Sequence, residues 1–351
     1  PAGFRLGAAS IPRGELVGRP GVLIAEACEF NRSFHNYRPW LASISSVEAD
    51  HLDIYGSFEA VVQSFNEFAK LVAPANQGGL LLIAHDGAHR KEVTAGVACA
   101  VQTIGFEPEA DWVVSHDPAT HHTTLSRDGG RDRRCEWTMR IPGSHNAMNA
   151  ANAAALALML GADPLKVGLS LSAFAGVDRR TQFLGTRRLP DGGGGESGGV
   201  RVYDDYGHHP TEIDSTLRAL RAFERPEDRG GRLICVFQPH QHSRTRFLLD
   251  EFVNSFGGAD LVLVPDIYFV RDSEAEKQKI SSADLVDRLR ARHGASETPG
   301  QGPSAMHLHT FNAIVEHLET ICRPGDLLVV MGAGPVNQVA HGFLSAGRAV
   351  A

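Results

Sequence analysis

The chain has 351 residues, of which 42% are hydrophobic and 21% are charged, and its formal net charge at pH 7 is -7. This length favours two domains over one, and the hydrophobic fraction is ample for packed cores. The negative net charge argues against a general affinity for nucleic acid or for an anionic membrane surface. No apolar run approaches the roughly 20 residues of a membrane span.

The first residues and the cysteines are typical of a cytoplasmic protein. No long apolar segment follows Pro1-Ala2-Gly3-Phe4-Arg5, so the sequence shows no signal peptide. The five cysteines are scattered and have no paired spacing, which indicates reduced thiols that mostly fill the core. We therefore expect a cytoplasmic location.

The first half of the sequence predicts a sheet with helices packed on it. Buried strands are expected at residues 22–25, 41–47 and 80–83. Helices are expected at 58–72 after Gly56-Ser57, from Gly143 to about Leu160, and again after Asp163-Pro164. Between them, residues 111–115, 122–126 and 136–140 alternate in polarity and predict more exposed, antiparallel strands.

The second half begins after a glycine-rich stretch at 189–199, where we expect a flexible loop, most simply a solvated hairpin tip. Beyond it, apolar strands at 233–237, 261–265 and 327–331 each precede a helical pattern. This alternation implies right-handed crossovers and a parallel, Rossmann-like sheet. We expect an α/β protein with one domain at 1–180 and a second at 181–351.

Two strand ends in the second half carry many polar side chains. Residues 202–212 contain three carboxylates, two tyrosines and two imidazoles, and residues 233–246 end in a turn rich in histidine and arginine. Open α/β sheets bind ligands at the carboxyl ends of their strands. Histidine and arginine at two such ends favour an enzyme that binds an anionic substrate.

A carboxylate and an imidazole follow the strands predicted at 22–25 and 41–47. Glu26 opens the segment Glu26-Ala27-Cys28-Glu29, and His51 closes the segment Glu48-Ala49-Asp50-His51. At neighbouring strand ends, such side chains can hold Mg²⁺, with waters that complete an octahedral shell. Solvated strand-end acids and a capping histidine explain the same residues equally well.

Three shorter patterns admit either a functional or a structural explanation. Asn146 and Asn149 lie three apart near a predicted helix start, where carboxamides can read a purine edge but also serve as caps. Arg179-Arg180 can clamp phosphates or form a solvated surface pair. Gly332-Ala333-Gly334 follows a strand but lacks the third glycine of a dinucleotide fingerprint, so it is more typical of a tight turn.

Taken in chain order, these segments resemble the Mur ligase family over nearly the whole sequence. Ala25 to Phe34 is similar to V-E-A-D-E-S-D-x-S-F, Glu48 to Tyr55 to E-A-D-H-M-D-x-Y, and Pro142 to Asn149 to P-G-x-H-N-x-x-N. Asp204 to Glu212 matches D-D-Y-G-H-H-P-T-E, and Phe237 to Thr245 is similar to F-Q-P-H-R-Y-S-R-T. The last two patterns are the most specific, and they resemble most closely the members that join L-alanine to UDP-N-acetylmuramate.

The resemblance implies ATP-dependent amide formation in peptidoglycan precursor synthesis. The lactyl carboxylate of UDP-N-acetylmuramate would take the γ-phosphoryl group of ATP, and the amine of L-alanine would displace phosphate from the acyl phosphate. The resemblance assigns His208, His240 and Arg244 to the pocket for the acyl phosphate and alanine. It assigns six further residues to ATP and Mg²⁺: Glu26 and His51 to the metal, Asn146 and Asn149 to adenine, Arg180 to the phosphates as the domains close, and Asp205 to the ribose.

The sequence departs from the family pattern at several positions. Cys28 stands where the pattern has Asp, and Phe269-Val270-Arg271 replaces the usual small residues. Gln241 replaces an Arg, whose charge His242 can supply only when it is protonated.

The chain also contains no G-x-x-x-x-G-K-[ST] loop, because none of its five lysines follows a glycine. The family carries such a loop after an N-terminal UDP-binding domain, and we expect both to precede Pro1. The first domain would then be an incomplete central ATPase-type sheet domain, followed by a Rossmann-like C-terminal ligase domain. We expect the polypeptide alone to be inactive. Two alternatives stay open: a short module that binds nucleotide or sugar-peptide without ligase activity, and a related peptide-recycling muramate ligase.

Overall fold

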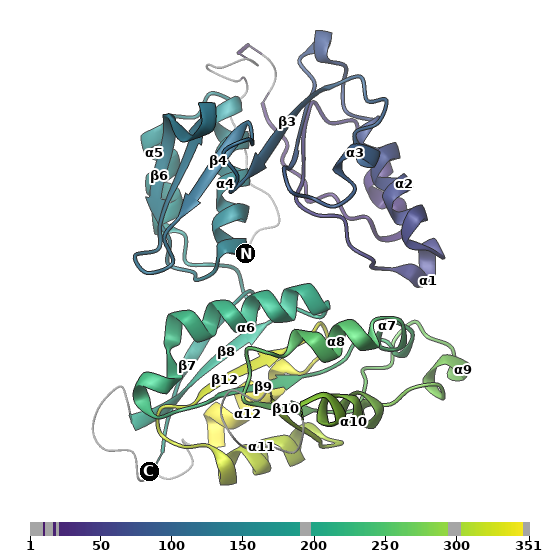
Figure 1. Cartoon of the computed structure of the whole chain (residues 1–351), viewed down its shortest axis with the longest axis vertical. Coiled ribbons are helices and arrows are strands. Elements are labelled where there is room, and N and C mark those ends of the chain that lie inside the picture. Colours follow the sequence, from purple (N-terminus) through teal and green to yellow (C-terminus); the bar gives the residue numbers. More distant parts are fainter. Residues whose placement is uncertain (1–9, 11–16, 19–20, 190–197, 294–302, 347–351) are drawn as a thin grey trace. The chain divides into compact units, whose positions relative to one another are not determined.

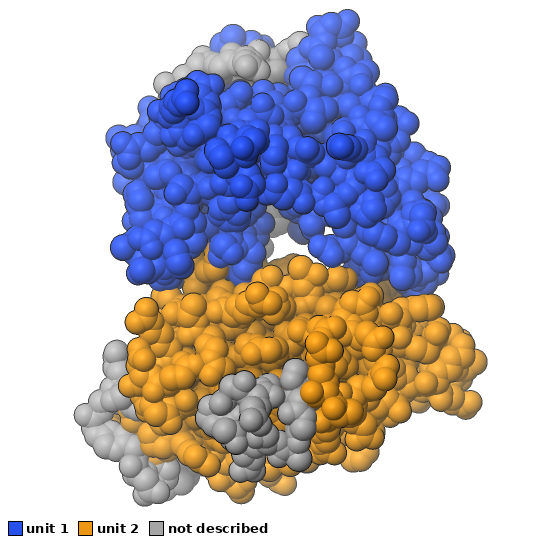
Figure 2. Space-filling view, viewed as in Figure 1, with its two compact units in different colours: residues 1–140, 144–174 blue, residues 141–143, 175–351 orange. Residues whose placement is uncertain are grey.

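The computed structural model describes residues 10, 17–18, 21–189, 198–293 and 303–346. The chain divides into two compact units, residues 1–140 with 144–174 and residues 141–143 with 175–351, coloured separately in Figure 2. Each unit contains one six-stranded, mainly parallel sheet with helices packed on it (Figure 1). The predicted α/β class is therefore confirmed. Residues 190–197 of the glycine-rich loop predicted at 189–199 lie outside the described residues.

The sheet of the first unit has the strand order β1-β2-β3-β4-β5-β6. Its strands are β1 (Leu41–Ile44), β2 (Leu80–Ala84), β3 (Ala100–Gly105), β4 (Trp112–His116), β5 (His122–Arg127) and β6 (Asp132–Thr138). Strands β1 to β4 pair in parallel, whereas β5 pairs antiparallel with both β4 and β6. The antiparallel pairing predicted for the strands between residues 111 and 140 is confirmed.

The helices of the first unit are η1 (Phe30–Asn36), α1 (Leu52–Tyr55), α2 (Phe58–Ala69), η2 (Ala75–Gln77), α3 (Arg90–Val93), η3 (Asp128–Gly130), α4 (Ser144–Met159) and α5 (Pro164–Ala173). The predicted starts of α2 and α5 are confirmed by their caps. Ser57 Oγ accepts from the amide of Ala60 at 3.3 Å, and Asp163 Oδ1 accepts from the amide of Lys166 at 3.2 Å.

Strand β2 shows why helices lie on both faces of this sheet. Successive side chains of a strand point to opposite faces, and those of β2 are apolar without interruption. Leu81 and Ile83 pack in the core cluster that contains α2, while Leu80 and Leu82 pack in the cluster that contains the alanines of α4. A strand that is buried on both faces has a continuous apolar sequence, and this sequence pattern predicted the strand at 80–83.

The strand predicted at 22–25 is wrong. This segment has no strand hydrogen bonds, and Leu23 and Ile24 are 86% and 87% exposed. A strand needs a neighbour to pair its backbone amides and carbonyls. Among the described residues, β1 is the edge strand and pairs with β2 alone. An apolar run therefore predicts a strand only where a partner strand lies beside it.

The sheet of the second unit has the strand order β11-β10-β9-β12-β8-β7. Its strands are β7 (Gln182–Arg188), β8 (Gly199–Asp205), β9 (Leu233–Phe237), β10 (Leu261–Val264), β11 (Ser304–His307) and β12 (Leu327–Met331). Only β7 is antiparallel to its neighbour among these strands. The strands predicted at 233–237, 261–265 and 327–331 are confirmed, and β7 and β11 were not predicted.

The helices of the second unit are α6 (Pro210–Glu224), η5 (Pro226–Arg229), α7 (His242–Phe247), α8 (Leu249–Ser255), α9 (Glu274–Lys277), α10 (Ser282–His293), α11 (Phe311–Ile321) and α12 (Asn337–Ala346). Helices α6, α8 and α10 share one core cluster with the sheet, and α11 and α12 share another (Figure 1). Within the described part of the chain, no helix is long and apolar enough to cross a membrane.

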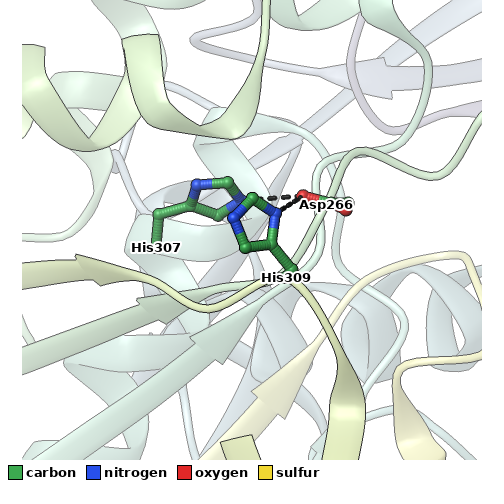
Figure 3. A group of neighbouring side chains, drawn as sticks. All are labelled: Asp266, His307 and His309. Atoms are coloured by element: carbon green, nitrogen blue, oxygen red, sulfur yellow. Dashed lines mark hydrogen bonds and ion pairs between the residues drawn. The ribbon is translucent and has the colours of Figure 1, made fainter. Parts of the chain in front are cut away.

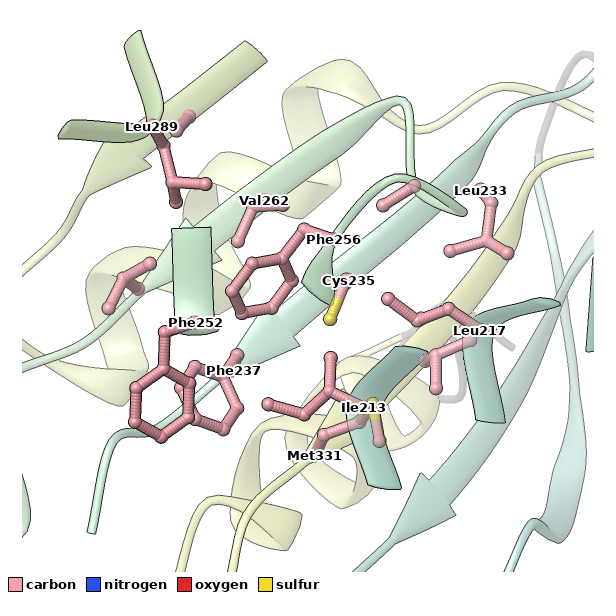
Figure 4. Packing of buried hydrophobic residues seen from close by; sticks show 14 of the residues in the cluster. Ile213, Leu217, Leu233, Cys235, Phe237, Phe252, Phe256, Val262, Leu289 and Met331 are labelled. Carbon is pink, nitrogen blue, oxygen red and sulfur yellow. The ribbon is translucent and has the colours of Figure 1, made fainter. Parts of the chain in front are cut away.

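The cysteines are all free thiols, as predicted. Cys99, Cys135 and Cys235 are buried, and burial raises the pKa of the Cys99 and Cys135 thiols. A raised pKa keeps these sulfurs protonated and unreactive. Cys235 lies on β9 in the core of the second unit (Figure 4).

An aromatic cluster fills the centre of that core. The rings of Phe252 and Phe256, from the segment of α8, lie 5.4 and 5.3 Å from the ring of Phe237 on β9 (Figure 4). All three side chains are fully buried. Truncation of any of the three side chains should lower the stability of the unit, because a buried phenylalanine that is shortened leaves a cavity.

We predict that Phe252→Ala lowers the free energy of unfolding of the second unit by about 3–5 kcal/mol. Phe247→Ala, at a position that is 50% exposed, is the control and should cost less than about 1 kcal/mol. Urea unfolding followed by the exposure of the Cys235 thiol reports on the second unit, while Trp40, Trp112 and Trp137 report on the first. Equal losses in the two variants would contradict the packing described.

Candidate active site

Three parallel strands of the second unit end at the same level. Met331, the last residue of β12, is in register with Asp205 of β8 on one side and with Phe237 of β9 on the other. The amide of Gly332 donates to the carbonyl of Asp205 at 3.1 Å, and the amide of Gln238 donates to the carbonyl of Met331 at 3.0 Å. The polar segments that follow these strands therefore start from one edge of the sheet, where open α/β sheets bind ligands.

Asp205 fixes the turn that leaves β8. Its Oδ2 accepts from the amide of Thr181 at 2.6 Å, and its Oδ1 accepts from the amide of Gly207 at 2.7 Å. Burial raises the pKa of Asp205 to about 6. A Cβ at Gly207 would lie 2.8 Å from Asp205 Oδ1, so only glycine fits this close approach. The ribose contact assigned to Asp205 stays a prediction. The donors that the structure gives this carboxylate are the amides of Thr181 and Gly207 and the hydroxyl of Thr181.

The two neighbouring arginines have different environments. Arg179 has a left-handed backbone with φ 61°, and its Nη2 donates to the carbonyls of Gly332 and Gly334 at 2.6 and 3.2 Å. It therefore ties the turn after β12 to the start of the unit. Arg180 is 54% exposed and pairs with Glu212 at 3.5 Å. Of the two, Arg180 is the one placed to meet a ligand from solution, and its phosphate contact stays a prediction.

The three residues predicted to be catalytic lie side by side. The rings of His208, after β8, and His240, after β9, are 5.9 Å apart between centroids. Arg244 Nη1, from α7, lies 3.3 Å from His240 Nδ1. Glu212 holds the turn, because its Oε2 accepts from the amides of His208 and His209 at 2.9 and 3.1 Å. Sequence segments about thirty residues apart thus place two imidazoles and a guanidinium at one point.

The loop after β10 supports His240 through backbone hydrogen bonds. Tyr268 forms an isolated parallel bridge with His240, and their rings are 5.6 Å apart. The amide of Tyr268 donates to the carbonyl of Pro239 at 2.9 Å, and the amide of Gln241 donates to the carbonyl of Tyr268 at 3.1 Å. Gln238 Nε2 also donates to the carbonyl of Asp266 at 3.2 Å. This loop was not identified as part of the site from the sequence.

A cation reaches the position where the family pattern has an arginine. Gln241 is 1% exposed, and Arg271 Nη2 donates to its Oε1 at 3.1 Å. Two departures from the family pattern are thus in contact. His242 is a poor substitute for the missing charge, because burial lowers the pKa of its ring and favours the neutral form.

The first unit contains a cluster of possible metal ligands. His51 Nε2 lies 3.3 Å from Glu29 Oε1 and 3.6 Å from Asp50 Oδ2, and the three ligand atoms lie within 4.8 Å of one another. The hydrogen bond from His51 lowers the pKa of Glu29, which favours the carboxylate that a metal binds. Two carboxylates and one imidazole fit a divalent cation whose remaining ligands are waters.

This cluster includes His51 but not Glu26, and the metal role of His51 stays a prediction. Glu26 is exposed and lies outside the group, so its metal role stays a prediction. Glu29 and Asp50 were missed, although both belong to the acidic segments that drew attention to the site. His51 has a left-handed backbone with φ 54°, and its amide donates to Asp50 Oδ1 at 2.6 Å. That conformation brings the ring and the two carboxylates together.

The two asparagines assigned to adenine lie on α4 outside its buried face. That face consists of small side chains, namely Ala147, Ala151, Ala154 and Ala155. Asn146 is half-buried and Asn149 is exposed. Asn152 is buried instead, and its Oδ1 accepts from Ser43 Oγ at 2.8 Å. The spacing of Asn146 and Asn149 is thus compatible with a ligand contact, which stays a prediction.

We predict that Asp205→Asn removes part of the pH dependence of the second unit's stability. Because the pKa of the folded carboxyl is raised to about 6, the folded chain holds this proton more tightly than the unfolded chain does. Its stabilising contribution is fully present below about pH 4, is lost as the pH rises through 6, and amounts to at most about 3 kcal/mol. Urea unfolding of the two proteins near pH 4 and near pH 7 measures the difference.

Asp250→Asn is the matched control, because that side chain is 80% exposed. It should leave the change in unfolding free energy between the two pH values as it is in the unchanged protein. If Asp205→Asn also left this change unaltered, the raised pKa of Asp205 would be refuted.

Comparison with known proteins agrees with this arrangement of two sheets. Residues 20–157 match the Mur ligase middle domain, and residues 194–334 match the Mur ligase glutamate ligase domain. A UDP-N-acetylmuramate–L-alanine ligase of Caldanaerobacter subterraneus is 33% identical over 331 residues, which are 93% of this chain and 65% of that protein. The ligase of the same name from Rubrobacter xylanophilus is 36% identical over 330 residues, which are 94% of this chain and 67% of that protein.

A solved structure supports the fold. The crystal structure of a UDP-N-acetylmuramate-alanine ligase from Thermotoga maritima matches with a TM-score of 0.64 at 20% identity, over 91% of this chain and 62% of that one. The chain thus spans about two thirds of the length of these proteins. From its two matched domains and its identity to these relatives, the chain belongs to the Mur ligase family.

Proposed function

We propose that this chain forms part of a cytoplasmic, ATP-dependent ligase that joins L-alanine to the lactyl carboxylate of UDP-N-acetylmuramate in peptidoglycan precursor synthesis. The observation that carries the proposal is the meeting of His208, His240 and Arg244 at one sheet edge. Two imidazoles and a guanidinium suit an acyl phosphate and the amine that attacks it. The names of the relatives support the choice of substrates.

The proposed reaction has two steps. A carboxylate oxygen of the lactyl group attacks the γ-phosphorus of ATP, the bond to the bridging β-phosphate oxygen breaks, and ADP leaves. The amine nitrogen of L-alanine then attacks the acyl carbon, the carbon–oxygen bond to phosphate breaks, and the nitrogen gives up its extra proton. Negative charge develops on oxygen in both steps, so donors that are already in place lower the barriers.

Hydrogen bonds give the two histidines complementary tautomers when both rings are neutral. The carbonyl of Tyr206 lies 3.2 Å from His208 Nδ1 and can only accept, so Nδ1 carries the proton and Nε2 is the acceptor. Arg244 can only donate, so His240 Nδ1 accepts at 3.3 Å and Nε2 carries the proton. His208 is therefore suited to take the proton of the alanine nitrogen, and His240 is suited to donate to the acyl oxygen.

In the first unit we assign Glu29, Asp50 and His51 as the protein ligands of Mg²⁺, with Glu26 as a further acidic residue of the same segment. The two carboxylates are hard oxygen donors of the type that this ion prefers, and the imidazole of His51 lies beside them. When bound, Mg²⁺ neutralises charge on the phosphate oxygens of ATP.

For the nucleotide we propose four contacts. On α4 of the first unit, Asn146 and Asn149 would face adenine, because their carboxamides can match its donor and acceptor edge. In the second unit, Arg180 would pair with phosphate oxygens and Asp205 with the ribose. Neither the metal nor the nucleotide contacts depend on the assignment of the two histidines.

We predict that the 351-residue polypeptide by itself forms no UDP-N-acetylmuramoyl-L-alanine, since no P-loop lysine is among its residues to face the β- and γ-phosphates. The same residues joined before Pro1 to the N-terminal UDP-binding domain and P-loop segment that the family resemblance implies should form it. The measurement is product mass after incubation with ATP, Mg²⁺, UDP-N-acetylmuramate and L-alanine.

Each alternative has its own outcome in this assay. Turnover by the isolated polypeptide would contradict the need for the P-loop. A fused protein that binds ATP but makes no product would favour a binding module. A fused protein that uses an L-alanyl peptide in preference to L-alanine would favour the peptide-recycling reaction.

We predict that Arg244→Ala in the fused protein lowers kcat by roughly 30- to 1000-fold, because a cation that meets developing oxyanion charge is worth about 2–4 kcal/mol. Arg246→Ala is the matched control on the same helix, since Arg246 pairs with Glu276 at 3.1 Å. It should leave kcat nearly unchanged. A thermal melt of each variant separates lost chemistry from lost folding, and an unchanged kcat in Arg244→Ala would remove the main support for the assigned site.

A further inference from the structure

A second group of possible metal ligands lies in the second unit, among residues that the proposed ligase chemistry does not use. His307 Nε2 and His309 Nδ1 both point at Asp266 Oδ1, at 2.8 and 3.1 Å (Figure 3). The two imidazole rings are 4.4 Å apart between centroids. All three ligand atoms lie within 4.8 Å of one another.

The sheet brings these residues together. Val264, the last residue of β10, is in register with His307, the last residue of β11, so Asp266 and the histidines follow two adjacent parallel strands. The amide of Leu308 donates to the carbonyl of Val264 at 3.0 Å, which holds the chain between the two histidines. His307 and His309 are two residues apart, the spacing that places side chains on one side of an extended chain.

The carbonyl of Asp266 is also held, because it accepts from Gln238 Nε2 at 3.2 Å. The main chain is thus fixed on both sides of the cluster. A site whose ligands are already placed loses little conformational freedom when it binds.

We propose that Asp266, His307 and His309 bind a divalent first-row transition metal such as Zn²⁺. Two nitrogens and one carboxylate oxygen are the ligand set that such ions prefer, whereas Mg²⁺ prefers oxygen. The cluster at Glu29, Asp50 and His51 has the opposite composition, with two carboxylates and one imidazole. The two units therefore carry sites of different selectivity.

The distances agree with such an ion. Zn²⁺ lies about 2.0–2.2 Å from nitrogen and oxygen ligands, so ligand atoms around a tetrahedral ion are about 3.4 Å apart. The nitrogen–oxygen distances of 2.8 and 3.1 Å need to lengthen by only a few tenths of an ångström. Asp266 and His309 are 62% and 76% exposed, so water can reach the remaining coordination positions.

When both rings are neutral, binding needs no change in net protonation. In the neutral rings, His307 Nε2 and His309 Nδ1 donate to the carboxylate, and each ring can move its proton to its other nitrogen. The nitrogens that face Asp266 then offer lone pairs to the metal. The carboxylate exchanges two hydrogen bonds for a bond to the ion.

Calorimetric titration of the 351-residue chain with ZnCl₂ tests the proposal, and His51→Ala removes the histidine of the other cluster. We expect the His51→Ala chain to bind one equivalent of Zn²⁺. Adding His309→Ala should weaken that binding by about 100-fold or more, because one of three protein ligands is lost. Asp266→Asn should also weaken it, and MgCl₂ in excess should not compete.

The matched control adds His317→Ala, on α11 outside the cluster, to the His51→Ala chain. This double variant should bind Zn²⁺ with the same affinity as the His51→Ala chain. Because His309 is 76% exposed, its replacement should not disturb folding. X-ray absorption of the bound zinc should show nitrogen and oxygen ligands without sulfur. Equal Zn²⁺ affinity with and without His309, or a sulfur ligand that indicates a cysteine site, would overturn the proposal.

Discussion

The pairing of β12 between β8 and β9 is the constraint on which the second unit depends. All five side chains of β12 are fully buried and alternate between the two core clusters. A shift of one residue would turn Leu327, Val329 and Met331 to the opposite face, so the cores on both sides enforce the register. That register places the ends of β8 and β9 level with each other. The position of His208 beside His240 is therefore a consequence of how β12 packs in the two core clusters.

Those parts of the structure that follow from a continuous apolar run could be predicted from the sequence. The run at 233–237 predicts a strand buried on both faces, and the polar residues after it are then expected at the sheet edge. The β-branched residues before Asp205 predicted a second strand end, and the two strand ends brought His208, His240 and Arg244 into one hypothesis. The family resemblance assigned the roles of these three residues, and the apolar pattern placed them after the ends of predicted strands.

The parts that were missed depend on backbone conformation or on neighbouring chain. Strand β11 (Ser304–His307) is short and half polar, so no pattern marks it, and the cluster with Asp266 stayed hidden. Glu29 meets His51 because of left-handed residues at His51 and within η1, which no periodicity encodes. The strand expected at 22–25 failed for the reverse reason, because its composition is right but no described strand pairs with it.

The proposed function requires that the side chains after β8 and β9 serve amide formation through an acyl phosphate. The most direct test places a heavy oxygen isotope in the lactyl carboxylate of UDP-N-acetylmuramate and follows it during turnover by the fused protein. We expect one labelled oxygen per amide formed to appear in inorganic phosphate, because the carboxylate oxygen bridges to phosphorus before the amine displaces it. Label that stays out of phosphate while product accumulates would contradict it.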